Sequence, residues 1–104
     1  MPDICASCQA AVIDVQVAKA CIALDMTGAK EFCLGGGVAA NRQLREAYEH
    51  ACGERGVRLT MPPMSACTDN AAMIALVALD RYGQGKFFGL DADAKAHTNL
   101  EDPY

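Results

Sequence analysis

The chain has 104 residues, which is enough for one domain or for part of one. Hydrophobic residues make up 52% of it, but many of these are alanine and cysteine, which bury little surface each, so we expect a thin stability margin. The net charge is −4, from 13 acidic and 9 basic residues. This balance disfavours broad nucleic-acid binding by this chain alone, because affinity for phosphates comes from clustered lysine and arginine.

The apolar spacing predicts five elements in the order α-β-α-β-α. They are a helix over about Ile4–Met26 capped by Asp3 and ended by Thr27-Gly28, a strand over 31–34, a helix over about Val38–Cys52, a strand over 57–61, and a helix from a Thr68 cap to about Tyr82. A strand, a helix and a second strand in succession predict a parallel strand pair joined by a right-handed crossover. Two strands make a poor sheet by themselves, so the pattern indicates the end of a larger sheet.

Each helix has an expected inner face. These faces comprise Ile4, Ala11, Val12, Val15, Ala18, Cys21 and Ile22 on the first helix, Leu44, Tyr48 and Ala51 on the second, and Ala72, Ala75, Leu76 and Leu79 on the third. On the first helix Val17 and Leu24 widen the apolar stripe, so we expect that helix to be covered on more than one side. On the second helix Arg42, Arg45, Glu46 and Glu49 are expected to point outward. The pattern weakens from Lys86 onward, so we divide the chain into an α/β segment over 1–85 and an extended tail over 86–104.

The six cysteines indicate reduced, packed thiols. Cys5, Cys8, Cys21, Cys33, Cys52 and Cys67 fall at helix and strand positions that look buried, whereas a disulfide framework places them in turns. The N-terminus lacks a basic region followed by an apolar run, and we expect no apolar stretch long enough to span a membrane. We therefore expect a cytoplasmic chain with no signal peptide and no membrane contact.

A run of three glycines, residues 35–37, follows the first strand and opens the second helix, which would place Asn41 one turn inside that helix. Glycines let backbone come close to a ligand, and a helix start suits a phosphate. Asn41 can offer a donor and an acceptor to a nucleotide. The run fits no standard phosphate-loop pattern, so a ligand site and a simple tight turn both stay open.

The second polar helix start is Thr68-Asp69-Asn70. In the first turn of a helix the Asp69 carboxylate is stabilised by the helix dipole, which is a sufficient structural reason for it. The alternative is that Asp69 is a hard oxygen ligand of a divalent metal. One carboxylate is not a metal site, and the two histidines, His50 and His97, form no metal-binding pattern, so the other ligands would lie outside this chain.

Three segments together resemble a known family. Residues 3–12 (DICASCQAAV), 36–45 (GGVAANRQLR) and 67–75 (CTDNAAMIA) are similar, in the same order and at matching spacing, to the C-terminal part of the TsaD family, formerly called O-sialoglycoprotein endopeptidase. The resemblance runs from Asp3 to about Gly85. Two departures are Ala71, where the family commonly has glycine, and Cys8, where it commonly has phenylalanine; both concern packing more than chemistry.

The resemblance implies an actin-like, ribonuclease H-like ATPase fold of two lobes, of which this chain would be the last part of one. It implies that Asn41, with Gly36 and Gly37, binds threonylcarbamoyl-AMP, and that Asp69 binds one divalent metal, iron or alternatively zinc. The other metal ligands would be two histidines of an HxxxH motif, which this chain lacks. The implied reaction transfers threonylcarbamoyl to the adenosine next to the anticodon of tRNA, with TsaB-like and TsaE-like subunits as partners.

If the resemblance holds, the chain carries no catalytic residue of its own, and we expect the isolated fragment to be inactive. Two other functions are considered: a non-catalytic TsaB-like interaction module of the same fold, and a metalloprotease, as the old family label says. The intact CTDN motif, residues 67–70, disfavours the interaction module, since a partner subunit has no need of Asp69. The absence of an HExxH helix disfavours the metalloprotease. An exposed sheet edge and exposed apolar faces also predict self-association of the isolated fragment.

Overall fold

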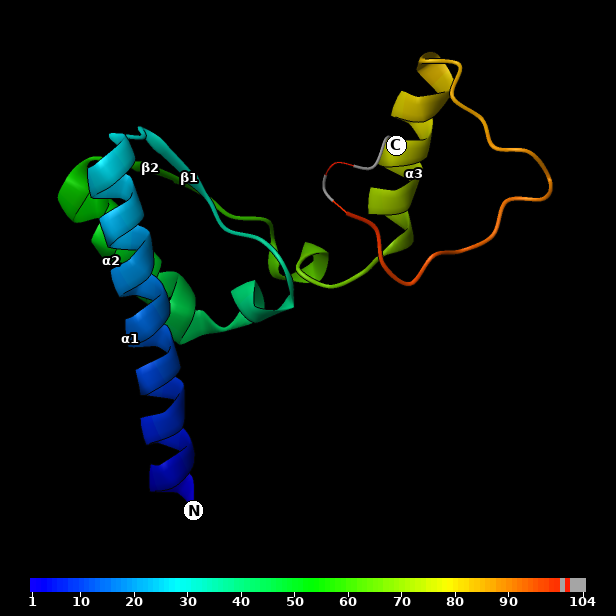
Figure 1. Ribbon diagram of the computed structural model, residues 1–104. Helices are drawn as coiled ribbons and strands as arrows, with labels where there is room; N and C mark the ends of the chain where they lie inside the picture. The colour runs from blue at the N-terminus through cyan, green and yellow to red at the C-terminus, as the bar shows by residue number, and fades with distance from the viewer. Residues whose placement is uncertain (100, 102–104) are drawn as a thin grey trace. The chain divides into compact units, whose positions relative to one another are not determined.

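The computed structural model describes residues 1–99 and 101. Its elements are α1 (Pro2–Thr27), β1 (Glu31–Cys33), the 3₁₀ turn η1 (Gly37–Ala40), α2 (Arg42–Arg55), β2 (Arg58–Thr60), the 3₁₀ turn η2 (Met64–Ala66) and α3 (Ala71–Gly83) (Figure 1). The two strands pair in parallel, with Phe32 opposite Leu59. The mixed α/β class and the parallel strand pair are thus confirmed. The chain divides into two compact units, Met1–Asp69 and the residues from Asn70 onward.

The core of the first unit lies between its two helices and its strand pair. Ile13 of α1 and Leu44 and Tyr48 of α2 are buried together, and Phe32 and Leu59 of the strands pack against them. The rings of Phe32 and Tyr48 stack with their centroids 5.2 Å apart. The inner face predicted for α2 is therefore confirmed, because a stripe repeating every three to four residues covers one side of a helix.

The inner face predicted for α1 is correct for Val17 and Leu24 and wrong for most of the main stripe. The side of α1 that faces α2 and the strands carries Ile13, Val17, Ala20 and Leu24, whereas Ile4, Val12, Val15 and Ile22 of the predicted stripe are exposed. Because α1 carries apolar residues around much of its circumference, its periodicity fits more than one face. The helix also begins at Pro2, so Asp3 lies in the first turn and does not cap it. Gly28, with φ 63°, ends it as predicted.

The length of α1 also corrects an expectation. Residues Pro2–Thr27 form a helix that contains an 18-residue window with a mean hydropathy of 1.3, so it is long and apolar enough to cross a membrane by length and composition alone. Alanine and cysteine raise the hydropathy of this segment without adding large side chains. Core helices of water-soluble proteins and signal sequences have the same two properties, so this feature alone is weak evidence. The lack of membrane contact stays a prediction.

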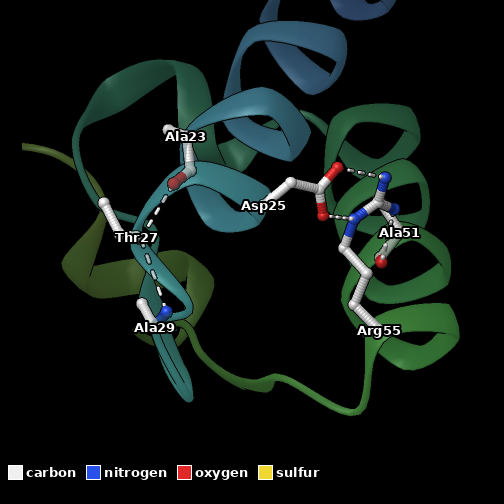
Figure 2. A network of polar contacts seen from close by, with 6 residues as sticks. All are labelled: Ala23, Asp25, Thr27, Ala29, Ala51 and Arg55. Carbon is white, nitrogen blue, oxygen red and sulfur yellow. Dashed lines mark hydrogen bonds and ion pairs between the residues drawn. The ribbon is translucent and has the colours of Figure 1, made fainter.

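The C-terminal ends of α1 and α2 are joined by a polar network (Figure 2). Arg55 Nε donates to Asp25 Oδ1 at 3.0 Å and its terminal nitrogen to Asp25 Oδ2 at 3.4 Å, which is a two-point contact between the helices. Thr27 Oγ1 donates to the Ala23 carbonyl at 2.8 Å within α1. The ion pair is exposed, so it adds little to stability and serves to fix the register of the two helices.

In the second unit α3 begins at Ala71 and is capped by Asn70, whose Oδ1 accepts from Met73 N at 3.0 Å. The predicted Thr68 cap is therefore wrong. In this chain none of the α3 residues is buried, and Leu76 and Leu79 are about 70% exposed, so the inner face of α3 stays a prediction. No helix or strand follows Gly83 among the described residues.

All six cysteines are free thiols, as predicted. Their predicted burial holds for Cys52 and Cys67 and is wrong for Cys5, Cys8 and Cys33, which are exposed. The exposed ones lie on the uncovered part of α1 and at the end of β1.

Candidate functional site

The glycine turn, residues 35–37, leaves open space beside its backbone. Leu34 N donates to Thr60 O at 3.0 Å, which extends the strand pairing to the start of the glycines. Gly36 adopts φ 91° and ψ 173°, a conformation that only glycine adopts readily. At Gly35 and Gly37 an added Cβ would meet no atom within 4 Å. Packing within the described residues therefore does not require these two glycines, and a ligand could approach the backbone there.

The helix predicted to open directly after the glycines is wrong. The four-residue turn η1 comes first, and α2 begins at Arg42, so Asn41 caps the helix and does not lie one turn inside it. Asn41 has extended backbone dihedrals, which its side chain stabilises by replacing the missing helical hydrogen bond. A four-residue turn presents no helix dipole of useful length, so phosphate binding by a helix start finds no support at the glycines.

The two ends of the Asn41 side chain have different roles. Its Oδ1 accepts from Leu44 N at 3.0 Å, which is the helix cap. Its main-chain carbonyl accepts from Arg45 N at 3.1 Å. Because the cap engages Oδ1, the Nδ2 group is the part of the half-buried side chain that can donate to a ligand.

Asp69 lies on an exposed segment just before α3. It precedes the Asn70 cap, so the expectation that it sits in the first turn of the helix is wrong. The reason is that Asn70, with φ −148° and ψ 155°, takes the cap position itself. Stabilisation of the Asp69 carboxylate inside a helical turn therefore does not explain this residue.

The described residues do not make a metal site by themselves. They include no group of three or more histidine, cysteine, aspartate or glutamate side chains that could hold an ion. His50 contacts Glu54 at 3.7 Å on the exposed side of α2. Asp69 could give a metal one oxygen, and it stays a prediction that the remaining ligands come from elsewhere.

Sequence reasoning missed Arg45, which was expected to point outward. The side chain is half-buried, and its guanidinium donates to the Ala39 carbonyl, the Pro62 carbonyl and Cys67 Sγ. It therefore connects the segment that ends in Asn41 with the segment that ends in Asp69. Its position four residues after Asn41, on the same side of α2, is the one signal that could have indicated this.

Comparison with known proteins decides the family. The sequence model of TsaD, tRNA N6-adenosine threonylcarbamoyltransferase, matches residues 1–76. The chain belongs to the TsaD family. A TsaD relative of that name from Variovorax paradoxus is 48% identical over 83 residues, which are 80% of this chain and 24% of the relative. Another from Halalkalibacterium halodurans is 43% identical over 100 residues, which are 96% of this chain and 29% of the relative.

These TsaD relatives are several times longer than the chain. A third, from Ruegeria pomeroyi, is 43% identical over 104 aligned positions, which cover 95% of this chain and 28% of the relative. The chain thus spans roughly a quarter of the length of the curated relatives it matches. The matched residues 1–76 include the glycine turn, Asn41, Arg45 and Asp69.

Proposed function

We propose that this chain is the C-terminal part of a tRNA adenosine threonylcarbamoyltransferase. In the complete protein, the threonylcarbamoyl group of threonylcarbamoyl-AMP would pass to the exocyclic amine of the adenosine next to the anticodon. The observation that carries the proposal is the TsaD match over residues 1–76, combined with coverage of only 24–29% of the relatives. The parallel pair β1–β2 would then belong to a larger sheet in one lobe of an actin-like ATPase fold.

The proposed role of the glycine turn is to hold the acyl adenylate. Open space beside Gly37 would let the substrate approach the main chain, and the Gly36 conformation would shape the turn. Asn41 Nδ2 would donate to the substrate while Oδ1 keeps the helix cap. A side chain fixed by its own cap is well suited to orienting a substrate, because little freedom is lost on binding.

The proposed role of Asp69 is to give one carboxylate oxygen to a divalent metal, iron or alternatively zinc. Its exposure just outside α3 supports this role, and the donor set of the described residues is too small for a metal site without residues from elsewhere. When bound, the metal would act as a Lewis acid on the acyl adenylate. The isolated chain should be inactive, because one wall of the site and the other ligands are missing.

The proposed partners are tRNA and TsaB-like and TsaE-like subunits, acting with the complete protein in the cytoplasm. The net charge of −4 indicates that basic tRNA-binding surface would come from other parts of the protein. The exposed apolar residues of α1 and α3 would be covered in the complete protein. In the isolated chain they favour self-association, which light scattering would detect as a mass above that of a monomer.

The test is a transfer assay with the complete protein encoded by the reading frame that contains these residues. Purified with its partner subunits and given threonylcarbamoyl-AMP, it should form threonylcarbamoyladenosine in tRNA, and residues 1–104 alone should not. The Asp69→Asn variant should lose the product, whereas the matched variant Asp14→Asn, of an exposed aspartate on α1, should retain it. Product formation by residues 1–104 alone, or by Asp69→Asn at the wild-type rate, would refute the assignment.

A further inference from the structure

One guanidinium holds both candidate segments of the first unit. Arg45 Nε donates to the Ala39 carbonyl at 2.5 Å, and one terminal nitrogen donates to the Pro62 carbonyl at 2.7 Å and to Cys67 Sγ at 3.0 Å. Ala39 precedes Asn41 by two residues, and Cys67 precedes Asp69 by two residues. The Arg45 side chain thus links the segment before Asn41 to the segment before Asp69.

The acceptors of this guanidinium are themselves fixed. Ala39 is 1% exposed and Cys67 is 4% exposed, so neither can move without disturbing its surroundings. The Cys67 thiol donates in turn to the Pro63 carbonyl at 3.6 Å. The planar fork of arginine can serve three acceptors in different directions, whereas the single ammonium of lysine cannot match that geometry.

We propose that Arg45 is a positioning residue that holds the glycine turn with Asn41 and the segment with Asp69 in one fixed arrangement. The inference rests on the proposed function, because it concerns how the substrate contact and the metal ligand are kept in register. The guanidinium of Arg45 is engaged by Ala39, Pro62 and Cys67, so its effect on transfer acts through the two segments. Small displacements of reacting groups are costly: about 1 Å can lower a rate about 100-fold.

Arg55 provides a matched comparison on the same helix. It also bonds to a residue of another segment, Asp25, and to a carbonyl of its own helix, Ala51 (Figure 2). It therefore resembles Arg45 in charge, in its helix and in linking α2 to another segment, but its partner there is a carboxylate, and its hydrogen bonds reach neither the glycine turn nor residues 67–70. A loss that is specific to Arg45 variants then reports positioning and not general weakening of α2.

The first experiment compares steady-state kinetics of Arg45→Lys, Arg45→Gln, Arg55→Lys and Arg55→Gln in the complete protein with its partner subunits. For both Arg45 variants we expect kcat to fall about 10- to 100-fold. The KM for tRNA should stay unchanged. Both Arg55 variants should keep the wild-type kcat. Arg45 variants with the wild-type kcat, or Arg55 variants with an equal loss, would overturn the proposal.

The second experiment does not depend on activity. The rate at which iodoacetamide alkylates Cys67 is measured by peptide mass spectrometry in the native complete protein and divided by the rate for the same thiol in the urea-unfolded protein. Arg45→Gln should raise this ratio, and Arg55→Gln should not. If the wild-type protein has no transfer activity, the proposed function fails, and the alkylation ratio alone then decides whether Arg45 holds the CTDN segment. An unchanged ratio in Arg45→Gln would overturn the proposal in either case.

Discussion

Asn41 has two separable tasks, and substitution can separate them. Its Oδ1 caps α2 by accepting from Leu44 N, and its Nδ2 is proposed to donate to the acyl adenylate. Asn41→Ala removes both groups, whereas Asn41→Ser keeps a capping oxygen and removes the amide donor, because serine caps about as well as asparagine.

The expected magnitudes follow from burial. A lost cap typically costs about 1 kcal/mol, and because Leu44 is 1% exposed its N–H cannot turn to water, so the cost for Asn41→Ala should lie near the upper end, about 2 kcal/mol. In a protein as long as the TsaD relatives, which are several times longer than this chain, that lowers the melting temperature by no more than about 4–8 °C. Asn41→Ser should melt close to the wild-type temperature.

The transfer assay then separates the two tasks. The loss of one neutral hydrogen bond to the substrate should raise the KM for threonylcarbamoyl-AMP about 3- to 10-fold in both variants. Thermal melts of the complete protein measure the loss of the helix cap, and steady-state kinetics measure the loss of the substrate contact. An Asn41→Ser variant with wild-type stability and wild-type KM would show that Asn41 acts only as a helix cap, and the substrate contact would be refuted.

The remaining predictions concern the fold around the site. Leu44→Ala should lower the free energy of unfolding by about 2–5 kcal/mol, because it empties the centre of a small core; urea denaturation would measure this, and a loss below that of the cap variant would contradict the burial. Gly36→Ala should cost about 1–3 kcal/mol through its positive φ, whereas Gly37→Ala, with open space around it, should leave stability nearly unchanged; equal effects would contradict the conformational argument. Burial raises the pKa of Tyr48 and of the Cys52 thiol, so their contribution to stability is present below the ordinary pKa values and is lost as the pH rises through the raised ones. Melting temperatures between pH 7 and alkaline pH should fall less steeply in Tyr48→Phe than in the wild type, and parallel curves would contradict this coupling.

The elements predicted most accurately are those with one clear face and explicit ends. The inner face of α2 is confirmed because charged residues cover its other side, and Gly28 ends α1 because glycine adopts its left-handed conformation without cost. The face of α1 could be predicted only in part, because apolar residues surround the helix and only tertiary contacts favour the side of Ile13 over that of Val12 and Val15.

The errors at the site have local causes. Asn41 caps a helix that the periodicity would start a few residues earlier, because Val38, Ala39 and Ala40 continue the apolar pattern. Asn70 caps α3 two residues after Thr68, and both residue types are favoured at a helix cap, so sequence alone does not choose between them. Arg45 could not be placed from sequence, since its three acceptors are two carbonyls and a thiol that only the folded chain brings together. Sequence motifs identify the candidate residues Asn41 and Asp69, but they do not predict the hydrogen bonds of Arg45 that hold the two segments.

The central claim is that Asp69 is one ligand of a metal that is otherwise held by residues outside this chain. The most direct measurement is the metal content of the complete protein, purified without chelator and analysed by mass spectrometry of the elements. We expect about one iron or zinc per wild-type chain, a loss of most of it in Asp69→Asn, and no loss in Asp14→Asn. An Asp69→Asn protein that retains the wild-type metal content would contradict this claim.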